Sequence, residues 1–305
     1  GGDGTLGVTV LTGVPDLAGN TLVADFTSGE IFTIDKTAPT VTSVTRTTPT
    51  TALTNADTVT FTVTFSKAVA DLTLGDLQLS GSSTGGSIES VSGSGTTWSV
   101  SVITGGDGTL GLTVLAGVAD LAGNTLTADF TGGETYTIDK TAPTVTSVVR
   151  TGAVAARTNA STVSFTVTFS EAVSELTASD LMLTGTATGA TLGTLSGSGT
   201  TWTVSVVTGN VDGTLGLTVL AGVPDLAGNT LAADFSGGET FTIDKTAPTV
   251  SSVTRVGTSP TNATSVIYTV TFSEMVTGVD ASDFQVFTVA GTVLVGSLQV
   301  SGSGN

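Results

Sequence analysis

A twelve-residue phrase, TIDKTAPTVTSV, recurs along the chain and constrains its architecture more than any other feature. It occupies residues 33–44 and 137–148, and it returns at 242–253 with Ser251 in place of a Thr. Successive copies are 104 and then 105 residues apart. Helical solenoids, leucine-rich repeats and propeller blades repeat about every 20–50 residues, whereas a period near one hundred matches a complete small domain. The sequence therefore predicts a head-to-tail array of small domains.

The repeat divides the chain into two complete modules and two partial ones. The complete modules are 37–140 and 141–245; residues 1–36 match the closing part of a module and 246–305 the opening part. The last residues, SGSGN, stop where the other copies continue with TTWSVSV (96–102) or TTWTVSV (200–206). We expect a window of a longer repetitive protein. The alternative is a subunit with a missing strand that a neighbouring copy supplies.

Composition excludes several classes of function. The chain has 25 acidic and 8 basic residues, a net charge of −17, so it lacks the clustered Lys and Arg that bind nucleic acid or anionic membranes. No apolar run approaches the roughly 20 residues of a membrane span. There is no Cys and no His, which removes thiol chemistry, disulfides and most zinc or copper sites. A Thr- and Gly-rich, acidic, Cys-free array is typical of a secreted or surface protein of bacteria.

Alternating apolar residues predict an all-β module. In TVSFTVTF (162–169), for example, Val163, Phe165, Val167 and Phe169 share one face. The strands predicted for the second module are 144–150, 162–169, 179–185, 191–197, 200–207, 214–222 and 239–245. Seven short strands separated by turn residues indicate tandem immunoglobulin-like β-sandwich modules. Trp98 and Trp202, equivalent residues of the fifth strand, are predicted to lie in the core rather than to form a sugar-stacking platform.

The topology of such a sandwich gathers acidic residues from distant segments. The chain enters at one pole, and the loops after the second, fourth and sixth strands return to it. The second of these joints thereby collects four candidate metal ligands: Asp139, Glu171, Asp180 and Asp225. Clustered carboxylates repel and raise one another's pKa, and calcium, which takes 6–8 oxygen ligands, would offset that cost. The alternative is a solvated acidic rim, in which the Asp residues of DLAGN and SDL hold turns.

The other two joints repeat the pattern incompletely. The candidates are Asp35, Asp76 and Asp120 at the first joint, and Asp244, Glu274 and Asp283 at the third, with Asp280 as an additional ligand. At the first joint Lys67 replaces the Glu of the motif FSE, and an ammonium can supply part of a metal's charge. We therefore expect calcium to bind the first joint weakly or not at all.

The linker within each joint is predicted to be stiff. Pro39, Pro143 and Pro248 restrict the preceding alanines to extended conformations. The phrase TIDKTAPTV contains no Gly or Ser, unlike a flexible tether. With a bridging ion, successive modules would form a semi-rigid rod.

Four motifs carry a resemblance to a known family: IDKTAPTV at each junction, VTFSE(A/M)V after the second strand, SDL or SDF soon after, and DLAGN before the last strand. Together they resemble the bacterial Ig-like tandem repeats of large surface adhesins and biofilm-associated proteins, over essentially the whole chain. The resemblance implies an extracellular or surface-attached stalk, often stiffened by interdomain calcium, that holds an adhesive domain away from the cell. Lys67 is the position at which the pattern fails.

The predicted function is therefore a structural stalk segment whose partners are the neighbouring modules of the same chain. The rival is a self-assembling S-layer, sheath or filament subunit, with strand donation between copies as one route. An enzyme is not expected, because without His or Cys it would need paired carboxylates, and these recur in every module without an aromatic cleft. A carbohydrate-binding module would need exposed aromatic residues, and those present are in core phase.

Overall fold

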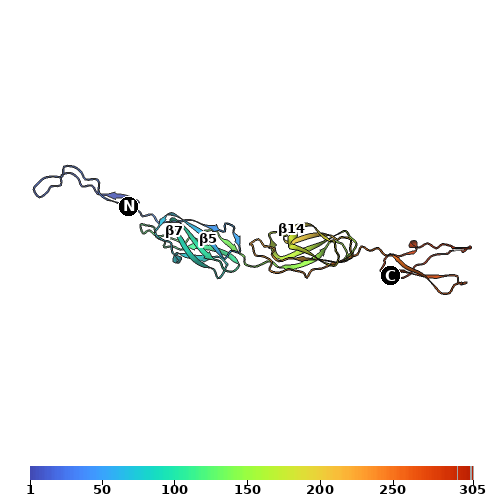
Figure 1. The fold of residues 1–305 in the computed structure, drawn as a ribbon. Coiled ribbons are helices and arrows are strands. Elements are labelled where there is room, and N and C mark those ends of the chain that lie inside the picture. The colour runs from blue at the N-terminus through green and yellow to red at the C-terminus, as the bar shows by residue number, and fades with distance from the viewer. Residues whose placement is uncertain (294, 303, 305) are drawn as a thin grey trace.

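The chain forms an elongated row of β-structured units (Figure 1), described here from a computed structural model that covers residues 1–293, 295–302 and 304. Two sandwich modules lie end to end, with a partial unit on either side. The first partial unit is a hairpin of β1 (Gly4–Gly7) and β2 (Ile31–Ile34), and the last contains β17 (Val250–Val256), β18 (Ile267–Phe272) and the short 3₁₀ turn η3 (Ala281–Asp283). No helix in the described part of the chain is long and apolar enough to cross a membrane.

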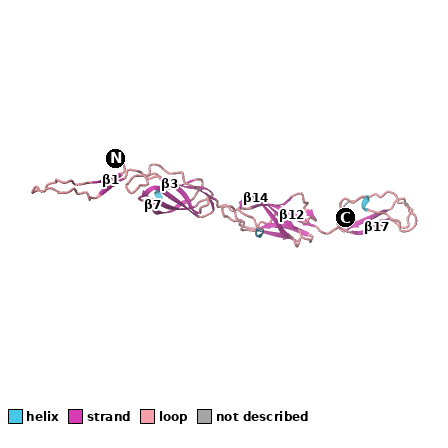
Figure 2. Cartoon of the chain, turned by 90° about the horizontal axis from the view of Figure 1, so that it is seen from above, coloured by secondary structure: helices cyan, strands magenta, loops and turns pink. Residues whose placement is uncertain are grey.

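The module 37–140 is a sandwich of two sheets, seen from a second side in Figure 2. One sheet has the order β3-β5-β7 and the other β4-β9-β8-β6. The elements are β3 (Val41–Thr48), β4 (Leu53–Thr54), β5 (Thr58–Val69), η1 (Leu74–Asp76), β6 (Leu77–Ser80), β7 (Ser87–Ile103), β8 (Gly108–Val114) and β9 (Tyr136–Ile138).

The module 141–245 repeats this arrangement, with sheets β10-β12-β14 and β11-β16-β15-β13. Its elements are β10 (Val145–Thr151), β11 (Arg157–Thr158), β12 (Thr162–Val173), η2 (Ala178–Asp180), β13 (Leu181–Gly185), β14 (Thr191–Val207), β15 (Gly213–Val219) and β16 (Phe241–Ile243). The all-β, immunoglobulin-like prediction is thus confirmed.

Two details differ from the sequence-based strand boundaries. The predicted strands 191–197 and 200–207 form the single element β14, which folds back on itself at Gly199 (φ +62°). A Cβ on Gly197 would lie 2.4 Å from the Thr201 carbonyl oxygen, so the two arms run against each other there. The second difference is β11, a strand of two residues that pairs in parallel with β16. It is too short to show an alternating pattern in the sequence.

Alternation along the strands places the core as predicted. In β12, Val163, Phe165, Val167 and Phe169 are all buried, and the residues between them are at least partly exposed. The Phe165 ring meets that of Phe241 edge to face, with centroids 5.3 Å apart. Trp98 is buried and Trp202 packs against the core half-buried, so both face inward. Each module therefore has its own hydrophobic core.

The strand registers bring distant loops to the end of each module at which the incoming linker arrives, here called the N-terminal pole. Val145, near the start of β10, pairs with Phe169 near the end of β12, and Leu181 at the start of β13 pairs with Val219 at the end of β15. The loops that follow β12 and β15 therefore meet the incoming linker. Glu171, on the last part of β12, lies at this pole.

Candidate metal centre at the joint between the two modules

Three carboxylates from three separate segments meet at the joint between the modules. Asp139 directly follows β9, Glu171 lies near the end of β12, and Asp225 opens the DLAGN turn in the segment that follows β15. One oxygen of each lies within 4.8 Å of the others. The sequence predicted this juxtaposition from loops up to 86 residues apart, and the registers of the sheets produce it.

Asp225 is the buried member of the group, with 3% of its surface exposed. Its Oδ1 accepts backbone N–H bonds from Ala227 (2.7 Å), Gly228 (2.6 Å) and Asn229 (2.9 Å). The tight turn this requires places Gly228 at φ +102°, a conformation that glycine adopts without strain. The motif DLAGN therefore builds a turn whose first carboxylate is fixed at the N-terminal pole.

Asn229 ties the turn to the linker. Its Nδ2 donates to Asp225 Oδ2 (2.8 Å) and to the backbone carbonyl of Asp139 (2.9 Å). A bond to each partner holds two of the three acidic residues in fixed relation.

Glu171 is the electrostatically costly member. Its pKa is raised, first by burial and then by the neighbouring charges of Asp139, Asp225 and Asp107. Both effects disfavour the charged carboxylate, because burial removes water and like charges repel. No Lys or Arg among the described residues forms an ion pair with these three carboxylates.

The preceding module supplies a fourth acid, Asp107, which the sequence analysis missed. Its carboxylate accepts the backbone N–H of Lys140 and the hydroxyl of Thr141, and these bonds lower its pKa. Asp3 and Asp212 hold the other two linkers in the same way. The signal was available, since the DGTLG motif that contains these residues repeats with the same 104- and 105-residue spacing as the linker Asp.

The two modules also touch directly at this joint. The backbone N–H of Asn55 donates to the carbonyl of Ala227 in the DLAGN turn (3.3 Å). The Lys140 ammonium, on the linker, donates to the Asn55 carbonyl (2.6 Å) and to the exposed Asp57 (2.8 Å). These contacts connect the end of one module, the linker and the start of the next.

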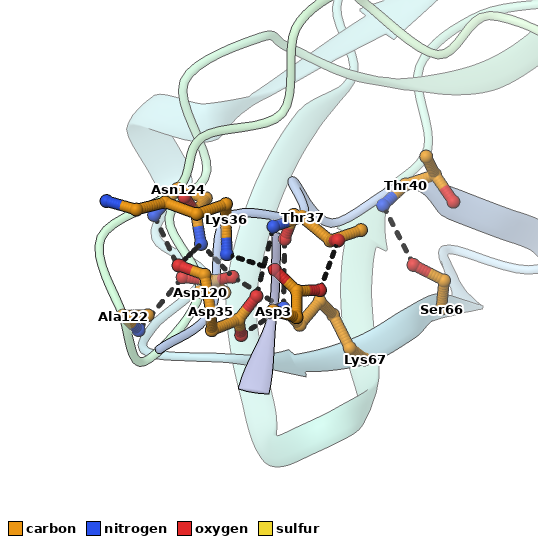
Figure 3. A network of polar contacts seen from close by, with 10 residues as sticks. All are labelled: Asp3, Asp35, Lys36, Thr37, Thr40, Ser66, Lys67, Asp120, Ala122 and Asn124. Atoms are coloured by element: carbon orange, nitrogen blue, oxygen red, sulfur yellow. Dashed lines mark hydrogen bonds and ion pairs between the residues drawn. The ribbon is translucent and has the colours of Figure 1, made fainter. Parts of the chain in front are cut away.

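At the first joint, a lysine lies among the equivalent acids (Figure 3). Lys67 Nζ forms ion pairs with Asp35 and with Asp120, the latter at 2.8 Å, and donates to the carbonyl of Thr37 (2.9 Å). Asp120 is 2% exposed, and its bonds from Lys67 and Asn124 hold its pKa far below the ordinary value. The same two aspartates raise the pKa of Lys67.

The third joint has a different arrangement again. Asp244 pairs with Arg157 of the preceding module (3.0 Å), and Glu274 lies nearby in a shallow cleft whose lining includes all three residues. Glu274 Oε1 is buried and has no hydrogen-bond partner among the residues that the structure describes. No further DLAGN motif follows Asp283 in this sequence, so Asp225 has no counterpart here.

The Asp residues of SDL, SDF and the equivalent GDL are placed in a different role. Asp180 Oδ2 accepts from the backbone N–H (2.8 Å) and hydroxyl (2.6 Å) of Thr177, which caps the turn η2. Its oxygens are not among those within 4.8 Å of one another at the joint. Asp76 and Asp283 cap η1 and η3 in the same way, and Asp280 is the N-cap of η3. Asp180 and its equivalents Asp76 and Asp283 therefore hold turns, which is the role offered above as the alternative for the Asp of SDL. Asp280, predicted only as an additional ligand, also holds a turn.

The fold and the joints together define a tandem array of Ig-like β-sandwiches. Residues 139–243, about a third of the chain, match the family model described as bacterial Ig-like domain. The module 37–140 shares its motifs and sheet order.

Two further comparisons were made. The crystal structure of invasin, a bacterial integrin-binding protein, is similar over 77% of this chain and 47% of the invasin chain, with 13% identity and a TM-score of 0.35. The matched region thus spans about half the length of invasin. No curated protein matches the chain.

Proposed function

We propose that this chain is a spacer segment of a bacterial surface adhesin, in which calcium stiffens the joint between the two complete modules. The observation that carries the proposal is the group of Asp139, Glu171 and Asp225, three acids that meet at a joint and form no ion pair with a Lys or Arg of the described residues. The tandem arrangement and the bacterial Ig-like family model support a stalk. Such a protein would lie outside the cell or on its surface and would have no catalytic role.

The donor atoms suit calcium. Oxygens bound to one calcium ion at about 2.3–2.6 Å can be separated by at most roughly 5 Å, which accommodates the spacing in this group. The donors are carboxylate oxygens from three separate segments of the chain, and oxygen is the ligand atom that calcium prefers. His and Cys, the preferred zinc ligands, are absent from the chain. Lys67 at the equivalent first joint serves as a stand-in for a cation, and its bond to Thr37 identifies the Thr141 carbonyl as a further candidate ligand.

An ion at this position would act mechanically. Asp139 belongs to the linker, whereas Glu171 and Asp225 belong to the following module. Binding all three would fix the linker against the module and leave it less freedom to bend. The Asp107 bonds already fix the linker against the preceding module, so the ion would complete the connection.

Isothermal titration of the metal-free chain with calcium tests the proposal. One site is expected, lost in Glu171→Gln and retained in Glu175→Gln, which removes an exposed acid just beyond the end of β12. Sedimentation velocity in calcium should show an elongated monomer. Absence of binding would contradict the metal site, and concentration-dependent association would favour the self-assembling subunit instead.

A further inference from the structure

Residues 67 and 171 occupy equivalent positions in the two complete modules, and we propose that the side chain at this position decides whether a joint binds a metal ion. Lys67 then holds the first linker against its module with or without calcium, whereas only the second joint responds to calcium. The first half concerns Lys67 alone, and the second half rests on the function proposed above.

The backbones around the two residues are equivalent. Strands β5 and β12 carry the same register shift, between Thr64 and Val69 and between Thr168 and Val173. Val69 bridges to Asp120, and Val173 bridges to Asp225. Lys67 and Glu171 therefore extend from matching positions toward matching aspartates.

The Asn and Asp residues that hold the linker also match between the two joints. The amide groups of Asn124 and Asn229 each bond the following module's Asp and the carbonyl of the linker Asp. Asp3 and Asp107 hold their linkers by the same two bonds. The difference in charge between the joints thus comes from one side chain.

The charge balance explains why one side chain is enough to decide whether a joint needs a metal ion. Two carboxylates and the Lys67 ammonium leave the first group at −1. The three carboxylates of the second group carry −3, which a divalent cation would also bring to −1. Lys67 supplies its charge as part of the chain, so a chelator cannot remove it.

The ammonium also reproduces an ion's contacts. It reaches three oxygens, from Asp35, Thr37 and Asp120, two of which belong to the linker. Its side chain is 27% exposed, so much of the stem is shielded from water. Lys67 accordingly ties the linker to the module, as the ion would at the second joint.

Hydrogen–deuterium exchange of the full chain, with calcium and with chelator, tests both halves. Linker amides of the first joint (residues 36–40) should exchange equally under both conditions, whereas those of the second (140–144) should exchange about tenfold faster with chelator. Calcium-dependent protection at the first joint would overturn the proposal.

Exchanging the two residues provides the sharpest variants. Lys67→Glu should raise the number of calcium sites from one to two, and Glu171→Lys should lower it to none while keeping the second linker slow in chelator. Glu175→Lys, the same charge change at an exposed position just after β12, should leave one site. An unchanged site count in Lys67→Glu, or fast exchange in a folded Glu171→Lys, would overturn the proposal.

Lys67→Gln separates this inference from the proposed function. It removes the ammonium without adding a carboxylate, so the first linker should exchange faster with no new site. If the wild-type chain binds no calcium, the proposed function fails, but faster exchange in Lys67→Gln still supports the Lys67 half. If the amides of the first linker exchange at the same rate in Lys67→Gln as in the wild-type chain, the Lys67 half of the proposal is overturned.

Discussion

Lys67 and Glu171 occupy the same position in successive modules and place opposite charges against equivalent pairs of acids. Lys67 is paired with Asp35 and Asp120, whereas the Glu171 carboxylate lies near Asp139 and Asp225. At the first joint the negative charges of the two aspartates are therefore partly neutralised by the Lys67 ammonium, whereas the second joint has an excess of negative charge. This difference underlies the predictions that follow.

Removing the amide that orients two of the acids should weaken calcium binding at the second joint. Asn229→Ala loses the bonds to Asp225 and to the Asp139 carbonyl. Loss of such a supporting partner typically costs about 10–100-fold in metal affinity, which titration calorimetry would measure. Asn124→Ala, at the first joint, is the matched control and should leave the affinity unchanged. Equal effects of the two variants would contradict the assignment.

The metal-free second joint should become more stable as the pH falls. The pKa of Glu171 is raised above 4.5, so the folded state binds its proton more tightly than the unfolded state. The resulting stability is present at low pH and is lost as the pH rises through the raised pKa. Thermal melts of the metal-free chain should therefore show a higher midpoint for module 141–245 near pH 5 than near pH 7.

The first joint should not show this trend. Asp120 has a lowered pKa and Lys67 a raised one, so their contribution is lost only in acid below the ordinary pKa of Asp or in strong base. Calcium should also abolish the trend at the second joint, since the ion favours the charged Glu171. A midpoint for module 141–245 that is independent of pH without metal would contradict the account.

Asp107 should secure the linker far more than Asp57 does, although both residues are exposed. Asp107→Asn weakens two bonds to the linker, at Lys140 and Thr141, so the amide of Lys140 should exchange faster. Asp57→Asn removes only a pair between a fully exposed carboxylate and the Lys140 ammonium, which water and salt screen. Exchange measured by NMR should separate the variants, and equal rates would show that Asp107 does not hold the linker.

One core hydroxyl distinguishes the two modules. Tyr136, fully buried, donates from Oη toward the carbonyls of Pro49 (2.8 Å) and Thr60 (3.0 Å), whereas its counterpart Phe241 has no hydroxyl. Tyr136→Phe should lower the free energy of unfolding of module 37–140 by about 0.5–1.5 kcal/mol. Denaturant titration would measure this, with the melting of module 141–245 as the internal reference. An unchanged midpoint would mean that the hydroxyl bonds contribute nothing.

Alternation and topology allowed much of the fold and part of the candidate site to be predicted. The buried set of β12 follows directly from period-two spacing, and the meeting of Asp139, Glu171 and Asp225 follows from which loops share a pole. Asp180 was grouped with them because it lies in the same loop region, but position in a loop does not determine where a side chain points. Its bonds to Thr177 are local, and a cap of this kind competes directly with a ligand role.

Contacts between a module and the linker that leaves it were the hardest to predict. Asp107 lies at the opposite pole of its own module, and only the adjacency of the next linker gives it a role. Arg157 reaches Asp244 from β11, a strand of two residues that has no periodic signal. Both pairings depend on the path of the linker after the last strand, and strand periodicity contains no information about that path.

The most direct test of the central claim is the distribution of distances across the second joint. The chain has no cysteine, so spin labels attach only at cysteines that are introduced. Ser90→Cys and Thr194→Cys lie at exposed, equivalent positions of the two modules, and pulsed electron paramagnetic resonance would measure the distance between their labels. We predict a narrow distribution with calcium that broadens with chelator and remains broad in Glu171→Gln under both conditions. Identical wild-type distributions with calcium and with chelator would contradict a metal-stiffened joint.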